Sequence, residues 1–338
     1  MTLEQFIEKV TSALEKHYGE DYRVRTLEVK KNNGVCLHGL SVFLKEGDNQ
    51  VAPTIYLDEF YERYQDGVTM SETIRKLIDI YESRTIKEKT VSMDFFADYE
   101  KVRDRIVYKL VNYRMNEELL KEIPYIMYLD LAVVFYYYME NEKIGAASIL
   151  IHDTHVKKWG ISMERLIADA EYNTPRVLGH RIANMEEMVR ELIRNDIRDK
   201  CCLDKDDGGQ GEEREAFLVD ELTDKMMDCF LEGEEKNLMY VLTNRCSHNG
   251  AACIRYPNVL KKFAERMGSD LYILPSSIHE VILLRSQGLE DDAGALRNMV
   301  KDVNRTQLDP EEVLSDQVYY YSRKSGKVGI CESKTNVK

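Results

Sequence analysis

The first hydrophobic positions of the chain recur at helical spacing. They are Phe6, Ile7, Val10 and Leu14. Residues three and four apart share one face of a helix, so this spacing predicts an amphipathic helix. Thr2 precedes the stripe and Gly19 follows it. Both residue types are typical of helix ends, and the predicted helix therefore runs between them.

An alternating pattern after this helix predicts a β-hairpin. Residues 22–30 and 35–44 both alternate apolar and polar side chains, and Asn32-Asn33-Gly34 lies between them. Asn and Gly tolerate the left-handed backbone that a tight hairpin turn requires. We therefore expect the two segments to pair as antiparallel strands.

Strand and helix patterns alternate through the rest of the chain. The strongest β signal is the apolar run 131–139, which is followed by a polar turn at 140–143 and a return strand at 144–151. Helical patterns begin at Asp153 and Ser162 and span 184–197 and 215–231. Further strands are predicted at 238–243, 251–256, 271–274, 281–284, 318–322 and 327–331.

Three segments of the chain resemble one another and predict an internal repeat. They are Val51–Asp58, Gly145–Asp153 and Gly250–Asn258. In each segment the second residue is Ala, the fourth carries a small hydroxyl or thiol group, and the fifth is Ile. Each segment ends with an Asp or Asn that can cap a following helix. One interpretation is a strand-turn-strand-helix unit of about 100 residues laid down three times, and the alternative is chance similarity.

The repeat and one charged segment define the expected domains. Residues 204–215 hold six acidic residues around Gly208-Gly209-Gln210-Gly211, which is typical of a solvated loop. We predict an α+β protein of three related units, with antiparallel sheets and helices on one face. The predicted divisions are a first α/β unit at 1–88, a second at 89–200, an acidic Gly-rich loop at 201–215 and a third α/β unit at 216–338.

Composition narrows the class of protein. The chain has 338 residues, of which 43% are hydrophobic and 32% are charged, which excludes a disordered chain and a membrane protein. Its net charge of −13 repels phosphate backbones, so we expect no nucleic-acid partner. The amino terminus lacks an apolar signal-peptide core, and the longest apolar stretch, 125–139, contains Asp130. We expect no membrane association.

Cysteine usage indicates a reducing compartment. The seven cysteines are odd in number and irregular in spacing, and no two of them form a CxxC pair. A disulfide framework or a zinc site would show regular spacing. We therefore expect reduced thiols and a cytoplasmic location.

Two clusters could carry chemistry. His152 and His155 lie three residues apart at a predicted helix start and could bind a metal on one helix face, although two ligands leave a site incomplete. Ser276, His279 and Glu280 follow Pro275 and could form a hydrolase site. Neighbours along a strand point to opposite faces, so a polar entry into a buried strand explains this cluster equally well.

The chain is also rich in tyrosine. It has 21, with triplets at 136–138 and 319–321. An exposed aromatic strip could bind a protein or peptide partner. The other interpretation is half-buried packing, because tyrosine favours strands.

Five segments carry a resemblance to a known family. They are Leu131–Phe135, Gly145–Ile149, Met239–Asn244, Asn249–Cys253 and Leu274–Leu283. Together they resemble an uncharacterised family of anaerobic gut bacteria known only as a domain of unknown function, and more distantly a second uncharacterised bacterial family. The resemblance implies a bacterial, soluble α+β protein. It brings no activity, cofactor or catalytic residue.

The sequence thus leaves the function open. The leading hypothesis is a non-catalytic cytoplasmic protein that acts through a protein or peptide partner. We expect no cofactor, and the sequence leaves open whether the protein is an enzyme. One alternative is a hydrolase that uses His279 with Glu280 or Ser276. Another is a metal-binding protein that uses His152 and His155.

Overall fold

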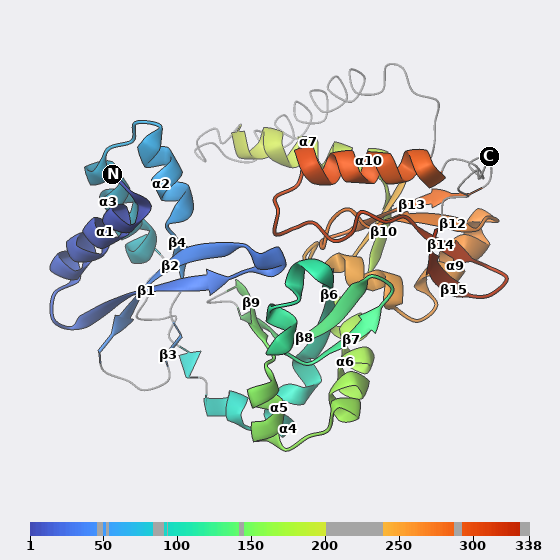
Figure 1. Cartoon of the computed structure of the whole chain (residues 1–338), viewed down its shortest axis with the longest axis horizontal. Coiled ribbons are helices and arrows are strands. Elements are labelled where there is room, and N and C mark those ends of the chain that lie inside the picture. Colours follow the sequence, from blue (N-terminus) through green and yellow to red (C-terminus); the bar gives the residue numbers. More distant parts are fainter. Residues whose placement is uncertain are drawn as a thin grey trace, which may run out of the picture. The chain divides into compact units, whose positions relative to one another are not determined.

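The chain folds into two compact units. Figure 1 shows a computed structural model, which describes residues 1–45, 50–51, 54–83, 91–92, 94–141, 145–200, 239–286 and 293–331. Unit 1 comprises Met1–Val177 and Pro310–Glu312, and unit 2 comprises Leu178–Asp309 and Val313–Lys338. The predicted boundary at 88–89, the acidic loop at 201–215 and the helix at 215–231 lie outside the described residues. The division into three units stays a prediction.

Unit 1 begins with the predicted helix and hairpin, and both are confirmed. Helix α1 (Leu3–Tyr18) starts in a capping box, in which the Thr2 hydroxyl accepts from the Gln5 amide. Strands β1 (Tyr22–Lys30) and β2 (Cys36–Leu44) pair antiparallel around the turn η1 (Asn32–Gly34). The turn needs the left-handed backbone at Asn33, whose φ is 58°.

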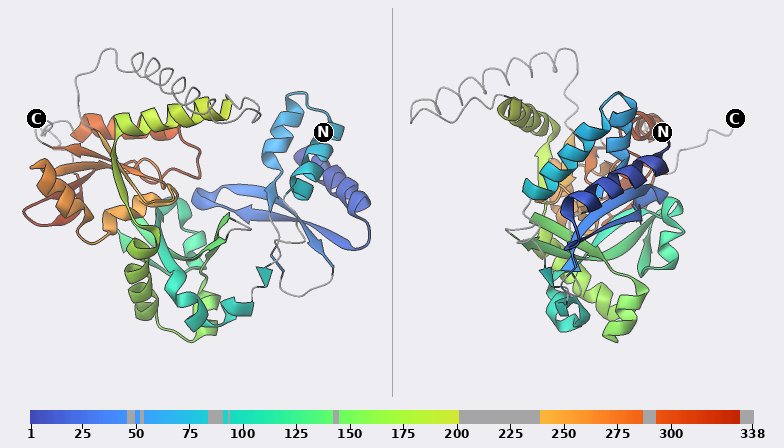
Figure 2. Two further views of the ribbon diagram at one scale, coloured as in Figure 1. Left: turned by 180° about the vertical axis from the view of Figure 1, so that it is seen from behind. Right: turned by 90° about the vertical axis from the view of Figure 1, so that its left-hand side faces the viewer.

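Three helices cover this hairpin. Strand β4 (Ile55–Tyr56) extends the sheet in the order β1-β2-β4, and β3 (Gln50–Val51) pairs separately with β5 (Val91–Ser92). Helices α1, α2 (Asp58–Gln65) and α3 (Met70–Ser83) gather on one side of the sheet (Figure 2). Their shared core consists of Phe6, Val10, Leu14, Val24, Leu40, Val42, Leu57, Leu77 and Tyr81.

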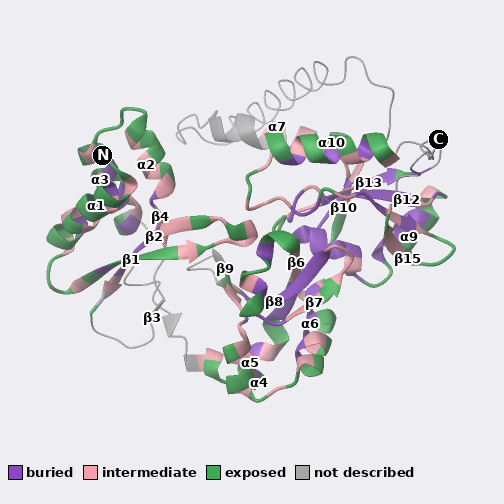
Figure 3. Cartoon of the chain, in the orientation of Figure 1, coloured by how far each residue is buried: buried purple, intermediate pink, exposed green. Residues whose placement is uncertain are grey.

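The second sheet of unit 1 is organised around one long strand. Strand β8 (Leu131–Asn141) pairs antiparallel with β6 (Ile106–Asn112), β7 (Tyr125–Tyr128) and β9 (Gly145–Leu150). Figure 3 shows β8 buried along most of its length. The helices and short turns of this part are η3 (Asp94–Ala97), α4 (Tyr99–Val102), η4 (Arg103–Arg105), η5 (Arg114–Asn116), η6 (Leu119–Lys121), α5 (Asp153–Trp159) and α6 (Met163–Leu178).

Burial decides between the two interpretations of the tyrosine triplets. Tyr136, Tyr137 and Tyr138 are all buried, although successive residues of a strand point to opposite faces. Tyr319 and Tyr321 are buried as well. The β8 rings therefore pack on both sides of their strand, and Tyr319 and Tyr321 pack on one side of β14. None of these five rings belongs to an exposed strip.

Unit 2 is one six-stranded antiparallel sheet, in the order β10-β11-β13-β12-β14-β15. Its strands are β10 (Arg181–Asn184), β11 (Tyr240–Thr243), β12 (Leu271–Leu274), β13 (Val281–Arg285), β14 (Tyr319–Ser322) and β15 (Lys327–Ile330). Its helices are α7 (Met185–Lys200), η7 (Gly250–Arg255), α9 (Val259–Met267) and α10 (Ala293–Thr306). The structure thus has an α+β fold with antiparallel sheets, as predicted.

Helices lie on both faces of this sheet, whereas the sequence suggested one. Tyr272 and Leu284 form a core with Leu296 of α10. Tyr240 is paired with Leu283, the neighbour of Leu284, and therefore points to the other face. The Tyr240 ring contacts the ring of Phe263 in α9, with centroids 5.0 Å apart. Helix α9 therefore packs on the face opposite α10.

The structure does not confirm the internal repeat. Gly145–Leu150 is a strand, but Gly250–Arg255 forms the 3-10 helix η7, so the predicted strand at 251–256 is wrong. The expected caps also fail. Asp58 accepts from the amide and ring of His38 instead, Asp153 lies inside its helix, and the Asn258 side chain makes no capping bond. Ala52, in the first copy, lies outside the described residues.

Candidate functional site: a cationic groove in unit 2

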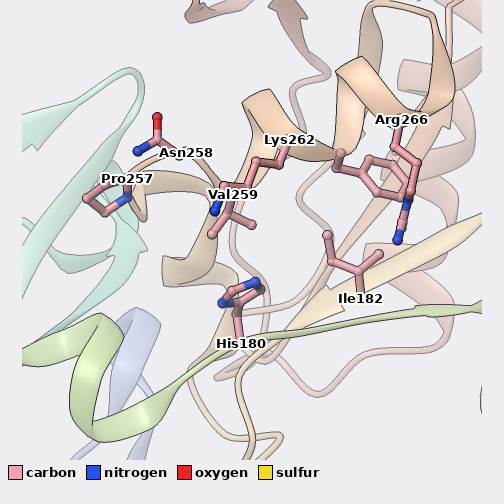
Figure 4. A pocket seen from close by; sticks show the side chains of 8 residues that line it. His180, Ile182, Pro257, Asn258, Val259, Lys262 and Arg266 are labelled. Atoms are coloured by element: carbon pink, nitrogen blue, oxygen red, sulfur yellow. The ribbon is translucent and has the colours of Figure 1, made fainter.

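Unit 2 carries a surface groove between its edge strand β10 and helix α9. The groove has a volume of about 390 Å³. Figure 4 shows the His180 ring opposite Val259, and Arg266 extending alongside Ile182. The lining residues are His180, Ile182, Pro257, Asn258, Val259, Lys262, Phe263 and Arg266.

The amphipathic pattern of α9 places its cations along the groove. Val259, Leu260, Phe263 and Ala264 are buried. Lys262 and Arg266 lie one turn apart on the exposed side, where residues at i and i+4 are neighbours. The Arg266 guanidinium sits over the Phe263 ring, 5.1 Å from its centroid, and this cation–π contact orients it.

An anchored turn presents His180 from the opposite wall. Gly179 adopts the left-handed conformation after α6, with φ of 60°. The Arg245 amide donates to the Leu178 carbonyl at 3.1 Å, and the Cys253 thiol lies 3.9 Å from the Gly179 carbonyl oxygen. A side chain at position 179 would collide with Arg245, whose Nε would lie 2.6 Å from a Cβ. The turn is therefore fixed, and His180 projects from a rigid support.

The groove combines positive charge with an apolar wall. Lys262 and Arg266 are cationic, His180 can become so, and none of the acidic residues that the structure describes lines the groove. These three side chains are exposed, whereas Val259 and Phe263 beneath them are buried. Exposed charges interact weakly one by one, so the site must act through several contacts. It is suited to an acidic ligand that also carries an apolar group.

The structure brings His279 into a hydrogen-bonded turn. Its Nδ1 accepts from the Asn249 amide at 3.3 Å, and its own amide donates to the Ser277 hydroxyl at 2.9 Å. Its carbonyl accepts from Thr243, and its ring lies 4.9 Å from that of His248. An imidazole that accepts at Nδ1 carries its proton on Nε2, which is the wrong tautomer for a general base acting through Nε2.

The other members of this predicted hydrolase site occupy different positions. The Ser276 carbonyl accepts from the Leu314 amide at 3.0 Å, which ties this loop to the segment after α10. Glu280 directly precedes β13 and is half-buried. None of Ser276, His279 and Glu280 lines the cationic groove. A hydrolase function at these residues stays a hypothesis.

His155 has a structural role at the start of α5. Its Nδ1 accepts from the His152 amide at 3.0 Å. Its ring packs edge-on against Phe96 with centroids 5.1 Å apart. Burial, followed by the charges of His152 and Lys158, lowers the pKa of His155 and so favours the neutral acceptor. Because Nδ1 accepts this hydrogen bond, the neutral ring carries its proton on Nε2, and neither nitrogen offers a lone pair to a metal in this arrangement.

Nothing completes a metal site at this pair. Among the residues that the structure describes, no three His, Cys, Asp or Glu side chains come together in a group that could hold a metal ion. Metal binding by His152 and His155 stays a prediction that elemental analysis can test.

Sequence reasoning missed the groove. His180 belongs to a short turn, and Lys262 and Arg266 resemble ordinary solvated residues of an amphipathic helix. The one available signal was a Lys and an Arg four residues apart beside a strongly apolar helix face. Only the pairing of β10 with β11, and the packing of Phe263 on Tyr240, bring His180 near that helix.

Comparisons with known proteins give a family but no activity. Within the described ranges, no helix combines the length and apolar character needed to cross a bilayer. Neither the curated proteins nor the solved structures contain a match. A family model does match residues 3–323, which is nearly the whole chain, and the resemblance to an uncharacterised family is thereby confirmed. The chain belongs to DUF5688, a family of unknown function.

Proposed function

We propose that unit 2 is a recognition module that binds an acidic segment of a partner protein in the groove between β10 and α9. The observation that carries this proposal is the convergence of His180, Lys262 and Arg266 on an apolar wall. No described acidic residue opposes them, although the chain has a net charge of −13. Complementary charge favours a negative partner and raises its association rate.

The openness of the groove favours a peptide over a small molecule. Sites for small molecules usually enclose most of the ligand's surface. Here the three polar side chains that would grip the ligand are themselves exposed. A peptide can contact such an open site at several points, with acidic side chains on the cations and an apolar side chain near Ile182 and Val259. Each exposed ion pair adds roughly 0.2–1 kcal/mol, so three pairs supply at most about 3 kcal/mol. A Kd on the order of 10–100 μM requires roughly 5.5–6.8 kcal/mol, and the apolar contacts must supply the rest.

The described cysteines support a cytoplasmic location for the protein. Cys36, Cys253 and Cys331 are free thiols. Burial raises the pKa of the Cys253 thiol to about 12, which keeps it protonated and inert. A reducing compartment suits such thiols.

A labelled acidic peptide tests the proposed function. The probe is a short fluorescein-labelled peptide of alternating Glu and Leu, and the measurement is fluorescence anisotropy with the full chain. We expect saturable binding that weakens about tenfold in a K262A/R266A double variant, because two ion pairs are lost. Lys261 is the matched control, since it lies on the same helix outside the groove.

The comparison of variants decides the outcome. K261A should bind like the unmodified protein. Equal weakening in K261A and in the double variant would mean that the probe senses only general charge, and the proposal would be wrong. Equal affinity for a peptide of alternating Lys and Leu would contradict it as well.

A further inference from the structure

Strand β10 forms one wall of the groove and is also the outermost strand of its sheet. Within the described part of unit 2, the sheet order gives β10 a single strand neighbour, which is β11. An edge strand carries backbone N–H and C=O groups on its outer side, and a further strand can pair with them. This wall of the groove is therefore a place where an extended segment can join the sheet.

The hydrogen bonds of β10 show which residue faces the open edge. The Met185 amide donates to the Met239 carbonyl at 2.9 Å, one step beyond the last pair of the β10–β11 register. Opposite residues of an antiparallel pair alternate between hydrogen-bonded and non-hydrogen-bonded pairs. Ala183, two residues before Met185, therefore bonds to β11. Ile182 lies between these bonded positions and directs its N–H and C=O to the open edge.

The side chain of the same residue lines the groove. Ile182 pairs with Leu242, so it lies on the same sheet face as Tyr240. Helix α9 covers that face, because Phe263 contacts the Tyr240 ring. Figure 4 shows Arg266 extending alongside Ile182. A strand added beside β10 would therefore lie along the groove, with every second side chain on the side of α9.

The cations of α9 decide which side chains the added strand should carry. Lys262 and Arg266 are exposed and line the groove. Directly opposite residues of an antiparallel pair point to the same face, with their Cβ atoms roughly 4.5–5.5 Å apart. The residue opposite Ile182 would thus project towards these cations, and an acidic side chain is favoured there. Acidic residues at every second position would keep the negative charge beside α9.

We propose that the acidic partner segment binds to β10 as an added antiparallel strand, with acidic side chains at alternating positions facing α9. This inference rests on the proposed function of the groove, and it specifies the conformation and sequence pattern of the partner. Antiparallel pairing is the arrangement of all the described pairs in this sheet. The Ile182 N–H donates to the carbonyl of the opposite residue, and the Ile182 carbonyl accepts from that residue's N–H.

Backbone methylation of the labelled Glu-Leu peptide tests this proposal by fluorescence anisotropy with the full chain. In the added strand, residues whose side chains face α9 direct their N–H groups to β10. Methylating every Glu amide should therefore weaken binding about fivefold or more, because a hydrogen bond is lost and the methyl group blocks close approach. Methylating every Leu amide places the methyl groups on the outer side, and affinity should change less than about twofold. Equal affinities of the two methylated peptides would overturn strand addition.

Proline at position 182 tests the same bond from the protein side. Ile182→Pro removes the outward N–H, and an edge strand tolerates proline where its N–H faces solvent. Ile182→Ala shortens the same apolar side chain but keeps the N–H. We expect Ile182→Pro to bind the peptide about fivefold more weakly than Ile182→Ala does. Equal affinity of these two variants would contradict the proposal, and circular dichroism checks that both are folded.

The opposite edge of the sheet supplies a matched control. The Cys331 amide donates to the Val318 carbonyl at 2.8 Å, so alternation along β15 directs the Val328 N–H to the open edge. Val328→Pro therefore makes the same change on an edge strand outside the groove. It should leave peptide affinity unchanged. A loss equal to that of Ile182→Pro would mean that proline acts through the whole sheet, and the assigned role of β10 would be wrong.

The proposed function and this inference fail in different ways. If the unmethylated peptide does not bind, or binds K262A/R266A equally well, the groove is not a site for acidic segments and both are wrong. If the peptide binds through the cations but tolerates methylation of its Glu amides, the groove holds an acidic segment without strand pairing. Only this inference is then wrong.

Discussion

Lys262 and Lys109 are the same side chain in opposite surroundings. Lys262 is exposed on α9 and faces an open groove together with Arg266. Lys109 lies in β6 among buried apolar residues, and its pKa falls to about 8. Water keeps the first lysine charged, so it can attract an acidic partner. Desolvation favours the neutral form of the second lysine, so its burial costs folding stability at neutral pH.

The comparison teaches that surroundings decide what a lysine does. In the groove, the charge is useful but weak, and affinity must come from several side chains acting together. In β6, burial of one lysine costs the fold some stability. The two effects can therefore be separated by altering the support of the groove, the desolvated amine, the groove charges or the ionic strength.

The largest effect is expected at Gly250, which supports the groove. A Cβ there would lie 2.5 Å from the His279 carbonyl oxygen and 2.6 Å from the Asn244 amide nitrogen, and both belong to the backbone. Gly250→Ala should therefore destabilise the protein by about 3 kcal/mol or more. Chemical denaturation followed by circular dichroism measures the change, and Gly294→Ala, where nothing lies within 4 Å, is the control. A loss below about 1 kcal/mol would contradict this account.

The next effect concerns the cost of Lys109. Its pKa is about 8 in the folded protein and near 10.5 otherwise. Between these values the unfolded chain binds more protons, so folding stability rises with pH across this window. Lys109→Met removes the burial of a charge and should stabilise the protein by about 2 kcal/mol at pH 7.

The pH dependence checks the sign of this effect. The advantage of Lys109→Met should shrink as pH rises from 8 and vanish above about 10.5. Denaturation midpoints of both proteins at pH 7 and pH 9.5 give the comparison. A constant difference would show that packing, and not charge, accounts for the change.

Reversing the groove charges gives a smaller effect, on binding alone. K262E/R266E replaces attraction by repulsion and should weaken the acidic Glu-Leu peptide by more than the tenfold expected of the alanine variant. The free energy of unfolding should stay unchanged, because both side chains are exposed. A parallel loss of stability would mean that the variant acts through the fold and not through the groove.

Ionic strength should produce the smallest effect and sharpen the contrast. Raising NaCl from about 0.05 to 0.5 M screens exposed charges, and peptide affinity should fall severalfold. Desolvated charges are screened much less. The stability difference between Lys109→Met and the unmodified protein should therefore change little, as measured by the same denaturation experiment.

The sequence predicted local elements well where one pattern dominated. The stripe of Phe6, Val10 and Leu14 and the turn at Asn33 predicted α1 and the first hairpin correctly. Segments that share one local pattern but fold differently were harder to assign to a helix or a strand. Gly145–Ile149 and Gly250–Ile254 look alike, yet the first pairs with β8 and the second forms η7. Gly250 packs so close to Thr243 and His279 that a Cβ would collide with both. This tertiary contact holds η7 without pairing to a strand, and the local pattern does not reveal it.

The candidate site was less predictable than the fold. His180 and Arg266 meet only through tertiary packing, which periodicity cannot reveal. The burial of Lys109 was hidden for a different reason, because one polar residue in an apolar strand is normally an exposed residue on an alternating face.

The three-fold pairing of β8 has a consequence for how the molecule opens. Its amides and carbonyls are shared among β6, β7 and β9, and residues 131–138 are buried on both faces. Residues 131–134 pair with both β6 and β7, and residues 136–137 pair with both β6 and β9. When one neighbour frays, these residues stay paired on their other edge. In a hydrogen–deuterium exchange time course, the amides of β8 should therefore be among the last in unit 1 to take up deuterium.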